Sequence, residues 1–254
     1  MKQNFNILKF GGSSIKNAKR IKHVAEIIQQ QQKNCKKIAI VVSACGGVTD
    51  KLIELSEIQN NQIQFEKLVS EIKTHHNQIC NDLSLSKNSD LEKLFLDLKK
   101  EKLNSNSKSQ FKDKILSYGE RISTHIISDY LNKINIKSEP LDARKVIITD
   151  NHFGNAFVHY QESYNKIQTY FSSTNQIQII TGFIGSTHDG QTTTLGRSGS
   201  DYTASIFGSA LNVDEIQIWT DVDGILSANP TIVEEANPIF HLNYEEAMEL
   251  AHAG

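Results

Sequence analysis

The opening stretch, NFNILKFGGSSIKNAKRI (residues 4–21), decides the fold of this chain. Phe5–Phe10 is a short apolar run of β character that carries Lys9 near its end. Two glycines and two serines follow at 11–14, and apolar residues then recur at helical spacing over 15–28. The pattern indicates a strand, a glycine-rich turn and an amphipathic helix that faces a sheet.

The turn has the composition of a phosphate-binding loop. Gly11 and Gly12 allow the backbone to approach a ligand closely, and the following helix N-terminus adds a partial positive charge. We expect Ser13 or Ser14 to cap that helix. Lys9 precedes the glycines, whereas a Walker A loop has its lysine after them, so this lysine could reach a transferring phosphoryl group. The alternative is a plain strand–helix connection with a surface lysine.

The rest of the chain continues the alternation of strand and helix. Segment 51–130 lacks proline and is rich in Leu, Ile, Glu and Lys, which predicts several helices. Further helices are expected over 201–211 and near the end of the sequence, where Asn243 and Glu246 resemble a capping box. Further strands are predicted over 36–44, 137–141, 146–149, 176–185 and 215–221.

This order predicts an αβα sandwich around a mostly parallel sheet, with a helical insertion around 51–130. Ligands of such sheets bind at the carboxyl ends of the strands, and each glycine-rich turn noted here lies at such an end.

The bulk composition excludes several classes of function. The 254 residues carry a net charge of −2, so no basic field favours nucleic acid. The apolar runs have strand length and predict no membrane span, and the start lacks a signal-peptide pattern. The three cysteines form no CxxC pair, which favours a reduced, cytoplasmic location.

Segment 194–204, TLGRSGSDYTA, is a second candidate site. Gly196 and Gly199 flank Arg197, whose guanidinium is a fork suited to a carboxylate. The alternative is a hairpin tip followed by an N-capping Asp201.

Two further segments contain acidic residues that are candidates for a binding site. Glu120 lies in the helical stretch SYGERIS (117–123), where a surface glutamate is the alternative. Asp221 and Asp223 follow a predicted strand in WTDVDGI (219–225) and could meet a nucleotide or a metal; an acidic turn is the alternative.

In chain order these segments resemble the successive motifs of aspartate kinase, in the amino acid kinase superfamily. The matching segments are KFGGSS, VVSACGGVTD, SYGERIS, TGFIG, TLGRSGSDYTA and WTDVDGI, and NYEEAMELAHAG resembles the helix that follows them. The resemblance runs over residues 7–254. KFGGSS combined with GRSGSDYTA is very specific, since carbamate kinase, glutamate 5-kinase and uridylate kinase share the fold but not this full set.

The resemblance implies roles for individual residues. Lys9 matches the catalytic lysine, and Asp201 matches the aspartate that orients it. Glu120 matches the residue that meets the substrate α-ammonium, and Arg197 the residue that grips its α-carboxylate. Further substrate contacts match Thr49, Ser198, Gly199 and Ser200, although Thr49 by its pattern alone is an N-cap. The nucleotide contacts match Gly11, Gly12, Ser13, Thr220 and Asp221, and no protein ligand to a metal is implied.

The chain departs from the family on the nucleotide side. Leu226 stands at a nucleotide-contact position where the family has tyrosine, and Thr231 stands where the family's Asp-Pro-Arg has its arginine. The sequence ends at Gly254, where the family continues with Ala-Lys and then with regulatory ACT domains. We expect an intact aspartate site and a weakened ATP site in a catalytic domain spanning 1–254.

The resemblance implies transfer of the γ-phosphate of ATP, with Mg²⁺, to the β-carboxylate of L-aspartate. This reaction begins lysine, threonine, methionine and isoleucine synthesis, and the parent chain is either monofunctional or fused to homoserine dehydrogenase. We also expect a homo-oligomer. The alternatives are another amino acid kinase, acting on glutamate or carbamate, and an aspartate-binding pseudokinase with impaired ATP binding.

Overall fold

The computed structural model describes residues 5–58, 61–101, 107–222, 224–229 and 232–253. The chain divides into two compact units, Met1–Trp219 and Thr220–Gly254, each of which is described by itself below. Within the described ranges, no helix combines the length and the apolar character needed to cross a bilayer.

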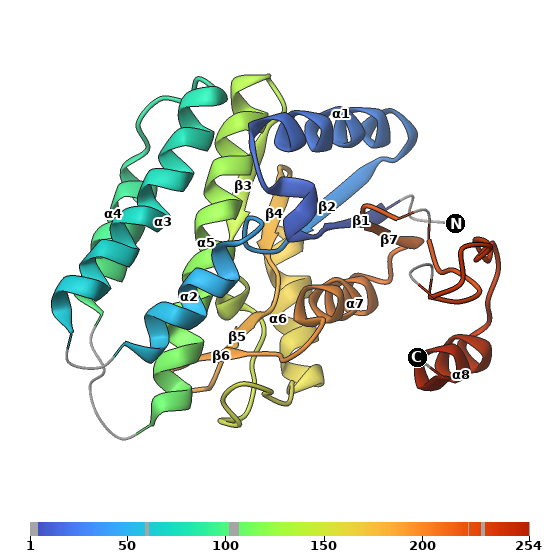
Figure 1. Cartoon of the computed structure of the whole chain (residues 1–254). Coiled ribbons are helices and arrows are strands. Elements are labelled where there is room, and N and C mark those ends of the chain that lie inside the picture. The colour runs from blue at the N-terminus through green and yellow to red at the C-terminus, as the bar shows by residue number, and fades with distance from the viewer. Residues whose placement is uncertain (1–4, 59–60, 102–106, 223, 230–231, 254) are drawn as a thin grey trace. The chain divides into compact units, whose positions relative to one another are not determined.

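The first unit is built on a five-stranded, fully parallel sheet (Figure 1). Its strands, in spatial order, are β3 (Ser138–Leu141), β4 (Ile177–Thr181), β2 (Lys37–Val42), β1 (Phe5–Phe10) and β7 (Glu215–Trp219). The three inner strands β4, β2 and β1 are almost entirely buried, as expected for a parallel sheet covered on both faces. The predicted αβα sandwich and parallel sheet are therefore confirmed.

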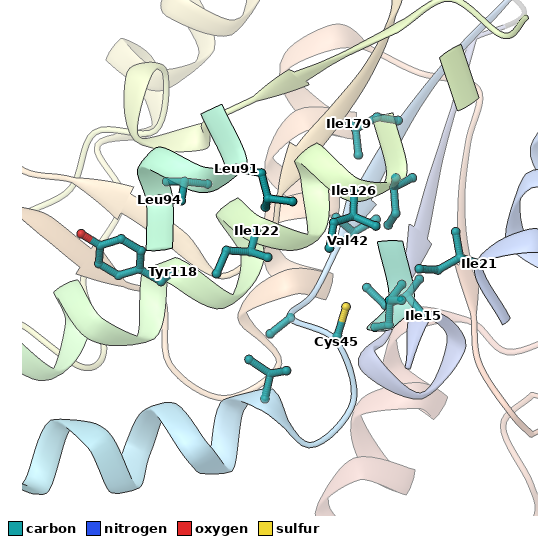
Figure 2. Packing of buried hydrophobic residues seen from close by; sticks show 14 of the residues in the cluster. Ile15, Ile21, Val42, Cys45, Leu91, Leu94, Tyr118, Ile122, Ile126 and Ile179 are labelled. Carbon is teal, nitrogen blue, oxygen red and sulfur yellow. The ribbon is translucent and has the colours of Figure 1, made fainter. Parts of the chain in front are cut away.

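Two hydrophobic cores lie on opposite faces of the sheet. The larger contains Val42 of β2 and Ile179 of β4 together with Ile126 of the longest helix (Figure 2). Burying one such side chain contributes about 1.5–3 kcal/mol. The helices of this core are α1 (Ala18–Asn34), α2 (Val48–Glu57), α3 (Gln62–Asp82), α4 (Ser89–Lys100) and α5 (Lys108–Lys133). The last four form the predicted helical insertion. The second core contains α6 (Tyr160–Ser172) and α7 (Gly199–Leu211).

The connections that follow two neighbouring strands lead to opposite faces of the sheet, and the position where they diverge locates the site. β2 leads to α2 on the face of the larger core, whereas β4 leads through a short antiparallel pair to α7 on the other face. A crevice forms outside the carboxyl ends of parallel strands where their connections diverge in this way. The site is therefore expected around the carboxyl ends of β1, β2 and β4.

The predicted helix caps are wrong at two turns near that crevice. Residues Gly12–Ile15 form a 3₁₀ turn, and the side chain of Asn17 caps α1 by accepting from the backbone N–H of Arg20 at 3.0 Å. Neither serine of the turn takes that role. Helix α2 starts at Val48 after Gly47, whose φ of +80° favours glycine, so Thr49 is not an N-cap.

Two of the predicted strands differ from the structure. Residues 146–149 form only isolated bridges, Ile148 to Ser186 and Thr149 to Val158, and follow directly on a 3₁₀ turn. The predicted strand 176–185 is broken at Gly182 and Phe183. Its second part becomes β5 (Ile184–Ser186), which pairs antiparallel with β6 (Thr192–Thr194) in a separate sheet.

The second unit is a loop region followed by α8 (Tyr244–Ala253). Leu226 forms a bridge with Pro238, which closes the loop region. The predicted capping box is confirmed: Asn243 N–H donates to Glu246 Oε2 at 2.8 Å, and Glu246 N–H donates to Asn243 Oδ1 at 2.9 Å.

Candidate active site

An ion pair between Lys9 and Asp201 marks the centre of the site. Lys9 is the penultimate residue of β1, with a side chain only 12% exposed, and its Nζ lies 2.6 Å from Asp201 Oδ1. Asp201 lies in the first turn of α7, so it is not the N-cap that its pattern allowed. The plain reading of Lys9 as a surface lysine is also wrong, since the structure holds its ammonium at the carboxyl end of the sheet.

Two glycine turns lie against each other beside this pair. A Cβ on Gly12 would come 2.8 Å from the carbonyl oxygen of Ala44, and a Cβ on Gly46 would come 3.1 Å from the carbonyl oxygen of Gly12. The turn after β1 and the turn after β2 therefore approach as only glycines permit. Gly11 and Ser13 belong to the same turn as Gly12, so the predicted phosphate-loop residues lie together next to Lys9.

Glu120 is a buried carboxyl at the edge of the crevice. It is 5% exposed, and its Oε1 accepts the backbone N–H of Ala44 at 3.1 Å. Burial raises the pKa of the Glu120 carboxyl to about 8, and the backbone hydrogen bonds oppose this only in part. The alternative of a surface helix glutamate is wrong. Such a carboxyl is suited to a cationic ligand, which would compensate its burial.

Serine hydroxyls join the end of β2 to the helices on both sides. Ser123 of α5 donates to the carbonyl of Ser43 at 2.7 Å, and Ser43 donates to the hydroxyl of Ser200 in α7 at 2.9 Å. Sequence reasoning missed Ser43 and Ser123. The only signal for Ser43 was its place directly after a buried strand, and a serine inside a helical pattern such as Ser123 carries no signal of its own.

Arg197 lies in the connection from β6 to α7, not at a hairpin tip. The connection is a tight turn in which Gly196 and Ser198 both have positive φ and Gly199 N–H donates to the Gly196 carbonyl at 3.1 Å. The Arg197 side chain is exposed, and within the described ranges its guanidinium has no hydrogen bond or ion pair. It is thus available for an external carboxylate.

The remaining predicted residues are distributed between the two units. Thr49 lies in the first turn of α2 with an exposed side chain. Thr220, Asp221 and Leu226 belong to the second unit, where Thr220 donates to Asp221 Oδ1 at 3.2 Å. Thr231 and Asp223 lie outside the described residues.

The first unit thus presents a phosphate-compatible glycine turn, a charged lysine–aspartate pair and groups suited to a zwitterion, which define an α/β phosphotransferase class. Residues 4–254 match the model of the amino acid kinase family, and the chain belongs to this family.

Individual relatives narrow the resemblance to aspartokinases. The chain is 35% identical over 98% of its length to aspartokinase 1, chloroplastic, of Arabidopsis thaliana, and 34% identical over 98% to the aspartokinase of Chlamydia muridarum (strain MoPn / Nigg). These matches cover 45% and 55% of the relatives, so the chain spans about half of their length. The expected cytoplasmic location remains a prediction, since one of these relatives is named as chloroplastic.

A solved structure supports the same resemblance. Escherichia coli aspartokinase III in complex with aspartate and ADP aligns with a TM-score of 0.83 at 29% identity, covering 98% of this chain and 56% of that one. The resemblance drawn from the sequence motifs is confirmed across the whole chain.

Proposed function

We propose that this chain is the catalytic domain of an aspartate kinase, which transfers the γ-phosphate of ATP to the β-carboxylate of L-aspartate. The observation that carries the proposal is a pair of groups suited to an amino acid near the Lys9–Asp201 ion pair. They are the buried carboxyl of Glu120 and the guanidinium of Arg197, which has no partner among the residues that the structure describes. Neither group alone would distinguish an α-amino acid from a simple diacid. The aspartate and ADP bound by aspartokinase III of Escherichia coli support the same reading.

The proposed chemistry needs charge neutralisation and alignment more than a general base. A free aspartate side chain titrates near ~3.9, so the attacking β-carboxylate is already ionised at neutral pH. Lys9 neutralises charge on the transferring group, and Asp201 holds the Lys9 ammonium in place. Glu120 binds the α-ammonium and Arg197 the α-carboxylate, and Ser200, whose hydroxyl accepts from Ser43, makes a further substrate contact.

Magnesium enters this proposal as part of the nucleotide substrate. Among the described residues there is no group of three or more His, Cys, Asp or Glu side chains that could hold a metal, and the carboxylate of Asp201 is paired with Lys9. The side chains of the described residues therefore form no dedicated magnesium cage. Mg²⁺ commonly binds through substrate phosphates and water and supplies charge neutralisation there.

The direct test is ADP release from ATP by the purified chain with a panel of acceptors. We expect turnover with L-aspartate and none with L-glutamate or carbamate, and the acyl phosphate product can be trapped with hydroxylamine. Turnover with glutamate or carbamate in place of aspartate would indicate another amino acid kinase.

A second candidate function is an aspartate-binding pseudokinase. The observation that favours it is the pair of departures at Leu226 and Thr231, both at positions that the resemblance assigns to the nucleotide. Calorimetric titration with aspartate, followed by a turnover assay with ATP and Mg²⁺, separates the two candidates, since a pseudokinase binds aspartate without turnover.

A further inference from the structure

A buried carboxylate other than Glu120 connects the segments around Arg197. Asp113, near the start of α5, is 1% exposed. Its Oδ2 accepts the backbone N–H groups of Gly154 and Thr194, both at 2.8 Å, and its Oδ1 accepts the Thr194 hydroxyl at 2.9 Å. Within the described ranges no cation forms an ion pair with it. A buried charge is costly unless it is hydrogen-bonded, and three donors satisfy this one.

Both partners of Asp113 are connected to the turn that carries Arg197, one along the chain and the other by packing. Thr194 ends β6 just before that turn, and its carbonyl accepts the N–H of Ala156 at 2.9 Å. The side chain of Asn155 occupies the space where a Cβ on Gly196 would lie. The loop around Gly154 is therefore packed on one side of the turn, and Asp113 fixes the loop and the strand end to the same helix.

The same helix also carries Glu120. Helix α5 runs from beside β6 to beside β4 and β3 (Figure 1). Glu120 follows Asp113 after about two helical turns, which places both residues on one face of α5. One rigid element thus holds Glu120 directly and the Arg197 turn through Asp113, so the spacing of the two groups is set by a helix and not by a loop.

We propose that Asp113 is a positioning residue for substrate specificity: by anchoring the end of β6 and the loop around Gly154 to α5, it holds Arg197 where it can grip the α-carboxylate of the acceptor amino acid. This inference rests on the proposed function. A charge-assisted contact such as that of Arg197 with a carboxylate contributes roughly 10- to 100-fold in Kd, so an anchor that places Arg197 matters to affinity.

The rival interpretation is that Asp113 only stabilises the fold. A double-mutant cycle distinguishes the two, because residues that act through each other are not additive whereas independent residues are. The four proteins are the native chain, Asp113→Asn, Arg197→Ala and the double variant. Asp113→Asn keeps the size of the side chain, so it is preferred to Asp113→Ala, which would leave three buried donors without an acceptor.

Aspartate binding is measured for each protein by calorimetry, and KM for ATP by ADP release. We expect Asp113→Asn to raise the aspartate Kd by roughly 10- to 100-fold and to leave KM for ATP within about twofold. In the Arg197→Ala background the same substitution should raise the aspartate Kd by no more than about threefold.

The matched control is Asp129→Asn. Asp129 lies on the same helix, is partly buried and ties α5 to another segment by accepting from Asn88 Nδ2 at 2.7 Å, but it is not among the site residues. We expect this variant to lower the melting temperature without changing the aspartate Kd.

Different results would contradict the proposed function and the proposed role of Asp113. If the native chain neither binds nor phosphorylates aspartate, both are wrong. If it binds aspartate, then an unchanged Kd in Asp113→Asn, an equal loss of ATP and aspartate binding, or full additivity with Arg197→Ala would overturn the inference alone.

Discussion

At the level of single residues, the ion pair of Lys9 with Asp201 leads to a prediction about turnover. The Lys9 ammonium is held at the end of β1, 2.6 Å from the Asp201 carboxylate. Lys9→Ala removes this charge from the transferring group, and we expect kcat to fall by a factor on the order of 10²–10³ with aspartate binding largely unchanged. Steady-state kinetics and calorimetry measure the two effects. Lys19→Ala, an exposed lysine in α1, is the control, and near-normal kcat in Lys9→Ala would refute the assignment.

Replacing Glu120 with a neutral residue should have opposite effects on the stability of the protein and on aspartate binding. Its folded-state pKa of about 8 lies above the ordinary value of 4.5, so the native state keeps a proton that the unfolded chain releases between these values. The favourable contribution is complete below about pH 4.5 and is lost as the pH rises through about 8. Glu120→Gln stays neutral throughout, because an amide does not titrate.

We therefore expect Glu120→Gln to melt at about the native temperature near pH 5 and above it near pH 8.5, while binding aspartate more weakly at both. Thermal unfolding at the two pH values, with calorimetry, measures this. Glu54→Gln, an exposed glutamate in α2, is the control and should show no such difference. A Glu120→Gln protein that is equally destabilised at both pH values would contradict the buried, protonated carboxyl.

At the level of elements, Gly119 sets how closely α5 approaches the turn after β2. A Cβ there would lie 2.6 Å from the Cβ of Ala44 and 3.1 Å from Cδ1 of Leu52. We expect Gly119→Ala to destabilise the protein by about 1–3 kcal/mol and to weaken aspartate binding, because it displaces Ala44 from Glu120. Denaturant unfolding and calorimetry measure the two effects.

A second helix glycine provides the comparison for Gly119. A Cβ on Gly208 in α7 would meet the end of the flexible Ile216 side chain, which is partly exposed on the edge strand and can move. Alanine also gains about 1 kcal/mol of helix propensity over glycine. Gly208→Ala should therefore cost less than Gly119→Ala, and the reverse order would show that the packing against Ala44 is not limiting.

The elements that the sequence predicted well are those with long periodic patterns. The buried strands β1 and β2 and the amphipathic helix α1 follow from runs of apolar residues, and the parallel sheet follows from their alternation. The break at Phe183 was missed, because a φ of +71° in a non-glycine residue is imposed by neighbours and leaves no mark on hydrophobic periodicity. The cap by Asn17 was missed because the serines before it are equally good caps by type.

The site was predictable to the extent that its residues follow strand ends. Lys9 and the glycine turn could be placed from local sequence, since ligands gather at the carboxyl ends of parallel strands. Asp113 and Ser123 could not, because each contributes through partners distant in the sequence, and a polar residue in a helix reads locally as a solvated one. Burial, which decides their role, is a property of the tertiary structure.

At the scale of the whole molecule, the groups proposed to read aspartate and the departures from the family lie in different units. Glu120, Arg197 and Lys9 belong to the first unit, whereas Leu226 and Thr231 belong to the segment from Thr220 onward. Substitutions at Glu120 or Arg197 should therefore change KM for aspartate, and substitutions at Leu226 or Thr231 should change KM for ATP, each without the other. Thr231, which lies outside the described residues, is neutral where the family resemblance implies an arginine.

The substitution Thr231→Arg would restore the positive charge that the family has at this position. A charge-assisted contact contributes about 1.5–3 kcal/mol, which corresponds to roughly 10- to 100-fold in Kd. We expect the native chain to have a KM for ATP in the millimolar range or above, and Thr231→Arg to lower it by up to that factor with KM for aspartate unchanged. Thr231→Gln, which adds length without charge, is the control and should leave both KM values near native. A micromolar Kd for ATP in the native chain would contradict the weakened nucleotide site and, with it, the pseudokinase alternative.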